Sequence, residues 1–149
     1  MMEEIIFKTK KIDKTFFGIS IFLYLFLILI ASYTFIKEND YQVFIPIGII
    51  IGIILLLQIL TYYQLKIIIK EQILYVHLFF TLYKVEISKI TKIRKGETMW
   101  SGFHKYGNSA KGLIVFSKSK EDLYITPENE ELFFKKILEI NPNVIIEMV

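Results

Sequence analysis

The chain has 149 residues, a formal net charge of +3 and no cysteine. Without cysteine, disulfides, thiol catalysis and cysteine-bound zinc or iron–sulfur centres are excluded. Apolar residues make up 54% of the chain, and they are concentrated in its first half instead of being spread evenly. This uneven distribution favours an integral membrane protein over a soluble one, and the length allows a pair of membrane helices plus one small domain.

Two long uncharged runs, Phe16–Ile36 and Val43–Leu65, are separated by a short polar segment. About 20 helical residues are enough to cross a hydrocarbon core of about 30 Å, so each run is long enough. We therefore predict a transmembrane helical hairpin over residues 16–65. The alternative for the first run is a cleaved signal peptide, but its apolar core is about twice the usual length of roughly 7–15 residues and no clear cleavage site follows.

The lysines indicate how the hairpin is oriented. Several precede the first run and others follow the second, whereas the connecting segment has only Lys37, against Glu38 and Asp40. Because cytoplasmic flanks carry the excess of Lys and Arg, both termini are predicted to be cytoplasmic. Within the second run, Gly48 and Gly52 form a GxxxG step, which predicts helix packing either inside the hairpin or between protomers. The alternative is that glycine is simply common in membrane helices.

After residue 63 the pattern changes to the alternation and the β-branched and aromatic content of strands. The region Lys95–Gly112 is rich in glycine and reads as a loop. A helix is predicted to start at Thr126 as the N-cap with Pro127 in its first turn, and to stop at Asn141. Residues 144–146 could return to the sheet. Strands are predicted over 64–70, 73–80, 83–87, 88–94, 113–116 and 123–126.

The predicted domains are a basic N-terminal segment over 1–15, the hairpin over 16–65 and a β-rich domain over 66–149. Antiparallel strands closed by one C-terminal helix have the outline of a pleckstrin-homology-like (PH-like) barrel. For residues 5–11 two readings remain: an extra edge strand of that domain, or a charged tail that only orients the hairpin. We favour the tail.

The chain resembles the bacterial PH-like membrane proteins of the YyaB type. The residues that carry the resemblance are 7–11, 63–69, 85–90, 109–110, 113–116 and, most specifically, the run from Tyr124 to Phe133 with Asn141–Asn143 after it. The resemblance implies a membrane-anchored domain without assigned catalytic residues, in the plasma membrane of a bacterium. Some small membrane proteins with similar domains are associated with self-immunity to secreted bacteriocins.

Basic side chains in the first half of the β-rich domain suit anionic lipid headgroups, at about 1 kcal/mol per residue near the surface. The alternative is that they reflect only the orientation signal and a solvated strand face. Trp100 and Phe103 in the predicted loop could contact the membrane interface or a partner, or could simply cover the barrel. The candidate headgroup or partner contacts are Lys66, Lys70, Lys89, Lys92, Arg94, Lys95, Trp100, Phe103 and Lys105.

Two histidines without cysteine give no metal-ligand spacing, and neither a phosphate-binding loop nor a nucleophile elbow is present. We therefore expect no catalytic residue, no metal, no cofactor and no nucleic-acid partner. The predicted function is a membrane-anchored interaction or scaffold module with a protein partner or a second copy. The alternatives are immunity or envelope-stress protection against a membrane-active bacteriocin, and sensing of anionic lipid headgroups.

Overall fold

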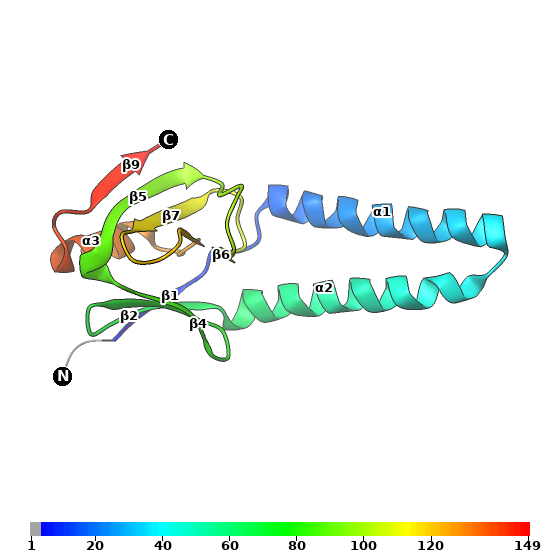
Figure 1. Cartoon of the computed structure of the whole chain (residues 1–149), viewed down its shortest axis with the longest axis horizontal. Coiled ribbons are helices and arrows are strands. Elements are labelled where there is room, and N and C mark those ends of the chain that lie inside the picture. Colours follow the sequence, from blue (N-terminus) through cyan, green and yellow to red (C-terminus); the bar gives the residue numbers. More distant parts are fainter. Residues whose placement is uncertain (1–3) are drawn as a thin grey trace.

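The computed structural model describes residues 4–149 and has two parts, a long helical hairpin and a β domain at its base (Figure 1). The hairpin consists of α1 (Lys14–Glu38) and α2 (Phe44–Gln64), joined by Asn39 in the left-handed conformation and a 3₁₀ turn at Tyr41–Val43. Both helices are long and apolar enough to cross a membrane, and Ala31 is the one residue of α1 and α2 that is buried. The two predicted long apolar helices are thus confirmed, with bounds within about two residues of the expected ones.

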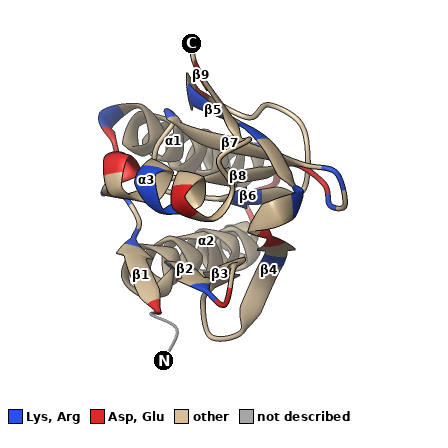
Figure 2. Cartoon of the chain, turned by 90° about the vertical axis from the view of Figure 1, so that its left-hand side faces the viewer, with Lys and Arg blue, Asp and Glu red and all other residues tan. Residues whose placement is uncertain are grey.

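The β domain contains two sheets and one helix. The four-stranded sheet has the order β1-β2-β3-β4, and the five-stranded sheet has the order β6-β8-β7-β5-β9. Figure 2 shows them as two layers, with α3 beside the space between them. The elements are β1 (Ile5–Lys8), β2 (Lys66–Lys70), β3 (Ile73–His77), β4 (Thr81–Glu86), a 3₁₀ turn (Ile87–Lys89), β5 (Ile90–Glu97), β6 (His104–Tyr106), β7 (Gly112–Ser117), β8 (Leu123–Ile125), α3 (Glu130–Ile140) and β9 (Ile145–Met148).

One hydrophobic core fills the space between the sheets. Alternating residues of the strands point inward, as Ile67 and Ile69 of β2 do, and both are almost completely buried. Helix α3 contributes Phe133 and Ile137, which are fully buried. The expected β-rich domain closed by a C-terminal helix is confirmed. Two pairings are parallel, however, β5 with β9 and β6 with β8, where only antiparallel strands were expected.

The N-terminal segment is not a charged tail. Residues Ile5–Lys8 form β1, which pairs antiparallel with β2, and the ring of Phe7 packs edge-on against Phe133 of α3 with 5.5 Å between the ring centroids. The preference for the tail was therefore wrong over this strand, because one buried aromatic outweighs the basic character of the residues around it. The first three residues of the predicted 1–15 segment lie outside the described residues.

Two boundaries also differ from expectation. Helix α3 is capped by Asn129, whose side chain accepts a hydrogen bond from the amide of Leu132, and not by Thr126. Thr126 is instead fully buried, and its hydroxyl accepts a hydrogen bond from the amide of Asn108 at 3.2 Å.

The predicted loop Lys95–Gly112 holds the end of β5 and the short strand β6. The expected return of residues 144–146 to the sheet is confirmed as β9.

Candidate functional site

The end of the β domain next to the hairpin is defined by the register of three strands. Lys66 begins β2 two residues after Gln64, the last residue of α2, and it is the cross-strand partner of both Lys8 in β1 and His77 in β3. The two helices leave the domain from this same side (Figure 1). We call this side, marked by Lys8, Asp13, Lys66 and His77, the hairpin end.

Helix α1 is fastened to the β domain by the carboxylate of Asp13. One oxygen caps the helix by accepting the amide of Phe16 at 2.7 Å. The other accepts the hydroxyl of Ser109 and the amide of Ala110, both at 2.7 Å. Burial raises the pKa of Asp13, but these hydrogen bonds outweigh it, and the net pKa is lower than its usual value of 3.8. The carboxylate therefore stays ionised at neutral pH and holds two segments together.

The segment that receives Asp13 is itself held by buried polar contacts. The Tyr124 hydroxyl donates to the carbonyl of Ser109 at 2.5 Å, and burial raises the pKa of Tyr124 to about 12, which keeps this donor protonated. The backbone amide of Lys10 donates to the carbonyl of Thr126 at 2.7 Å. The start of α1 is thus tied to two separate parts of the five-stranded sheet.

Helix α2 is attached differently, through the chain itself. Leu65, the single residue between α2 and β2, is 3% exposed and belongs to the core. A hinge at this point would have to pull Leu65 out of the core, at a cost of about 2 kcal/mol. Neither helix is therefore separated from the β domain by a flexible linker.

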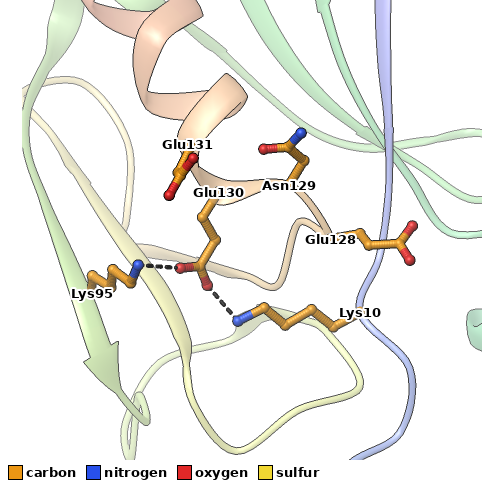
Figure 3. A pocket seen from close by; sticks show the side chains of 6 residues that line it. All are labelled: Lys10, Lys95, Glu128, Asn129, Glu130 and Glu131. Carbon is orange, nitrogen blue, oxygen red and sulfur yellow. Dashed lines mark hydrogen bonds and ion pairs between the residues drawn. The ribbon is translucent and has the colours of Figure 1, made fainter.

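A largely buried carboxylate, that of Glu130, links three elements on one side of the domain (Figure 3). It forms one ion pair with Lys10, in the segment before α1, and a second ion pair with Lys95 of β5 at 2.9 Å. Burial raises the pKa of Glu130, yet the two lysines outweigh it and the net pKa lies below 4.5. A cavity of about 590 Å³ is lined by these three side chains and by Glu128, Asn129 and Glu131. The lining holds two lysines and three glutamates, a formal charge of −1, so the cavity offers no excess of positive charge to an anion.

Four aromatic side chains project from two loops at the hairpin end. Phe79 and Phe80, which are 58% and 65% exposed, occupy the turn after His77, the partner of Lys66. Trp100 and Phe103, 87% and 89% exposed, occupy the loop after β5. This loop is held near α1, because the hydroxyl of Thr98 donates to the carbonyl of Ala110, which in turn is bound to Asp13. We call these four residues the aromatic tips.

The structure separates the basic residues that the sequence suggested as one surface. Lys66 and Lys105 lie near the hairpin end, whereas Lys70 is about 13 Å further along β2 at a rise of about 3.3 Å per residue. Strand β5 runs toward the hairpin (Figure 1), so Lys89, which precedes it, lies at the far end. The ion pairs are Lys70 with Glu4, Lys89 with Glu86, Lys92 and Arg94 with Glu147, Arg94 with Glu97, and Lys95 with Glu130.

Within the hairpin, the helices meet through a polar group and not through the glycines. The Tyr24 hydroxyl donates to Oε1 of Gln58 at 2.8 Å, and Nε2 of Gln58 donates to the hydroxyl of Ser20 at 2.9 Å. Apart from its own helix backbone and its chain neighbours, a Cβ placed on Gly48 or Gly52 would meet no atom within 4 Å, so neither glycine packs against α1 in this structure. Packing between protomers stays a prediction.

The two histidines lie in different strands, His77 in β3 and His104 in β6. His77 is half-buried in β3, and Nδ1 of His104 lies 3.0 Å from the hydroxyl of Tyr106. Within residues 4–149, no group of three or more His, Asp or Glu side chains is placed to hold a metal ion.

The family of the chain follows from its sequence over the strands and helix just described. The family model described as bacterial PH domain matches residues 61–141, from the end of α2 to the end of α3. The chain belongs to the bacterial PH domain family. The match covers the two sheets except β1 and β9, and it ends at Asn141, where α3 stops.

A relative of this bacterial PH domain protein supports the assignment. The chain is 26% identical over 110 residues to the uncharacterized protein YyaB of Bacillus subtilis (strain 168), covering 74% of this chain and 73% of the relative. No solved structure matches the chain. The YyaB-type resemblance noted from the sequence is thus confirmed.

Asp13, Ser109 and Lys8 were not among the candidate site residues that the sequence suggested. Asp13 stands directly before the first run of helix formers, which is where an N-cap is expected, so a local signal existed. Its long-range partners had no such signal, because nothing in residues 107–112 reveals which distant acid they bind.

Proposed function

We propose that this bacterial PH domain protein is a membrane-fixed interaction module, with a double-pass hairpin and a β domain held rigidly at the cytoplasmic surface of the plasma membrane. The observation that carries the proposal is the pair of direct attachments. Asp13 binds α1 to the segment before β7, and Leu65 places the end of α2 in the core. A domain held in this way presents the same surface to the cytoplasm at all times, which suits a scaffold.

The aromatic tips support the same placement. Aromatic side chains favour the headgroup region of a bilayer, and four of them project from the end where the helices leave the domain. In this arrangement, both loops rest on the inner leaflet on either side of the hairpin. The lysines that flank the hairpin agree with a cytoplasmic position.

Partner contact is proposed at the outer edge of β9. This strand ends the five-stranded sheet, and its backbone pairs with β5 on one side only. Ile145 and Met148 on this strand are 59% and 78% exposed. An edge strand with exposed apolar residues can accept a strand from another protein. No part of this role requires a catalytic group, and we propose that the protein is not an enzyme.

Crosslinking in native membranes followed by purification tests the proposal. The wild-type chain is compared with an Ile145→Lys/Met148→Lys variant and with a Lys118→Glu control, which alters an exposed turn residue. A defined set of proteins should be recovered with the wild type and the control and lost with the double variant. Recovery of the same bulk membrane proteins with all three would contradict an interaction role.

A further inference from the structure

Two lysines stand directly opposite each other at the hairpin end. Lys8 of β1 and Lys66 of β2 are cross-strand partners, and both side chains are exposed on the outer face of the four-stranded sheet. Cβ atoms of such partners are about 4.5–5.5 Å apart, and like charges in this position destabilise a sheet. Among residues 4–149 neither lysine has an ion-pair partner, whereas Lys70 at the other end of β2 is paired with Glu4.

The same two lysines line a cleft of about 320 Å³. Its wall includes a third lysine, Lys11, and the last turn of α2 with Tyr62 and Tyr63. One acid, Glu128, also lines the cleft, but its carboxylate is not within ion-pair distance of any described lysine, and thus the cleft keeps a net positive charge. The other lining residues are Thr9 and Leu65.

The cleft therefore brings together donors suited to an anion with several oxygens. Three ammonium groups and two phenolic hydroxyls can donate hydrogen bonds to it. The C-terminal end of α2 carries a partial negative charge of about half an elementary charge, which opposes an anion, but three lysines outweigh it. A bound anion would also relieve the repulsion between Lys8 and Lys66.

We infer that this cleft binds the phosphate group of an anionic phospholipid of the inner leaflet. The inference rests on the proposed placement of the hairpin in the membrane. It favours a lipid over a free anion because one wall of the cleft is the end of a helix whose exposed residues before Tyr62 are apolar, so acyl chains can lie against α2 while the headgroup enters the cleft. Basic pockets at the cytoplasmic ends of membrane helices are suited to such headgroups.

Native mass spectrometry of the full chain, released from nanodiscs, tests the inference. The discs contain phosphatidylcholine with or without phosphatidylglycerol, and the retained lipid is identified. The Lys8→Gln/Lys66→Gln variant is compared with a Lys118→Gln/Lys135→Gln control, which removes the same charge from exposed lysines outside the cleft. Insertion of the wild type, the double variant and the control into phosphatidylcholine discs is measured first. This measurement tests the membrane anchoring separately from the lipid site.

The wild type and the control should retain phosphatidylglycerol selectively. The double variant should bind it roughly 30-fold more weakly, since each surface lysine is expected to contribute about fivefold. In phosphatidylcholine alone the variant should unfold at a higher temperature than the wild type, because the like-charge pair is gone. Equal retention by variant and control would overturn the inference. So would a wild type that inorganic phosphate alone stabilises as much as phosphatidylglycerol does, because that result indicates a site for a free anion.

Discussion

The hydroxyl of Ser109 donates a hydrogen bond to the carboxylate of Asp13 across 96 positions of sequence, with 2.7 Å between the two oxygens. Asp13 caps the first helix of the hairpin, and Ser109 belongs to the segment that leads into β7. One side chain therefore sets both where α1 begins and how the β domain is oriented on it. A change at Asp13 should affect stability and orientation together.

Replacing Asp13 tests this junction. Asp13→Ala removes the cap and leaves the Ser109 and Ala110 donors without their acceptor, so the free energy of unfolding should fall by about 2 kcal/mol. Asp13→Asn keeps a capping oxygen, and it should cost roughly half as much, because only the contact with the β domain is impaired. Thermal unfolding in detergent measures both. No loss for Asp13→Asn would show that only the cap matters, and equal losses would show that only the contact with the β domain matters.

The same carboxylate predicts a pH dependence. The pKa of Asp13 is lower in the folded protein than its usual 3.8, so the ionised form contributes stability above that pH. This contribution should be lost as the pH falls below 3.8 toward the folded-state value. Unfolding temperatures of the wild type and Asp13→Asn should accordingly converge in strong acid. A difference that stays constant with pH would contradict this assignment.

Glu130 should be far more important than its neighbour Glu131. Glu130→Gln removes two ion pairs and leaves Lys10 and Lys95 without their partner, and we expect a loss of about 2 kcal/mol in the free energy of unfolding. Glu131 is exposed in the same helical turn, so Glu131→Gln should lose only the interaction with the helix dipole, about 0.5 kcal/mol. Denaturant titrations of the two variants make the comparison. Similar losses would show that Glu130 acts only through the helix end.

The sequence predicted the parts of the fold that depend on local pattern. Uncharged length defined the hairpin, and alternation defined most strands around Ile67 and Val85. What it missed depends on tertiary contacts. β1 forms because Phe7 packs against Phe133 in the core. Thr126 is buried and bound to Asn108, although its local sequence is typical of a helix cap.

The candidate site was less predictable than the fold, for a related reason. Composition gave a basic surface, but most of those side chains are neutralised by acids distant in sequence, such as Glu147 beside Arg94. Lys8 and Lys66 become opposed only when β1 and β2 pair, so no local pattern reveals them. A role in immunity or envelope stress, expected as an alternative, stays a prediction.

The polar contact inside the hairpin should stabilise the helix pair. Gln58→Leu removes both bonds that join α2 to Tyr24 and Ser20, and membrane measurements of such bonds suggest a loss of about 0.6–1.7 kcal/mol. Ser32→Ala is the matched control, because the hydroxyl of Ser32 bonds only to the carbonyl of Ile28 in its own helix. Unfolding in mixed micelles with increasing sodium dodecyl sulfate should separate the two. A larger effect from Ser32→Ala would contradict the role of Gln58.

Trp100 can report directly on the aromatic tips, because it is the single tryptophan of the chain. If the loop after β5 rests on the inner leaflet, Trp100 fluorescence should be quenched by brominated lipids and protected from iodide in solution. Phe103→Ser should reduce the quenching by lipid, since the neighbouring ring helps to hold the loop at the interface. Quenching by iodide alone would place the loop in water.

Cysteine labelling in intact cells can test whether the hairpin crosses the membrane twice and leaves the β domain inside. Because the chain has no cysteine, Gln42→Cys in the connecting segment and Ser119→Cys in an exposed turn of the β domain are each the sole reactive site. A membrane-impermeant maleimide should label Gln42→Cys in intact cells and Ser119→Cys only after lysis. Labelling of Ser119→Cys in intact cells, or of Gln42→Cys only after lysis, would contradict this arrangement.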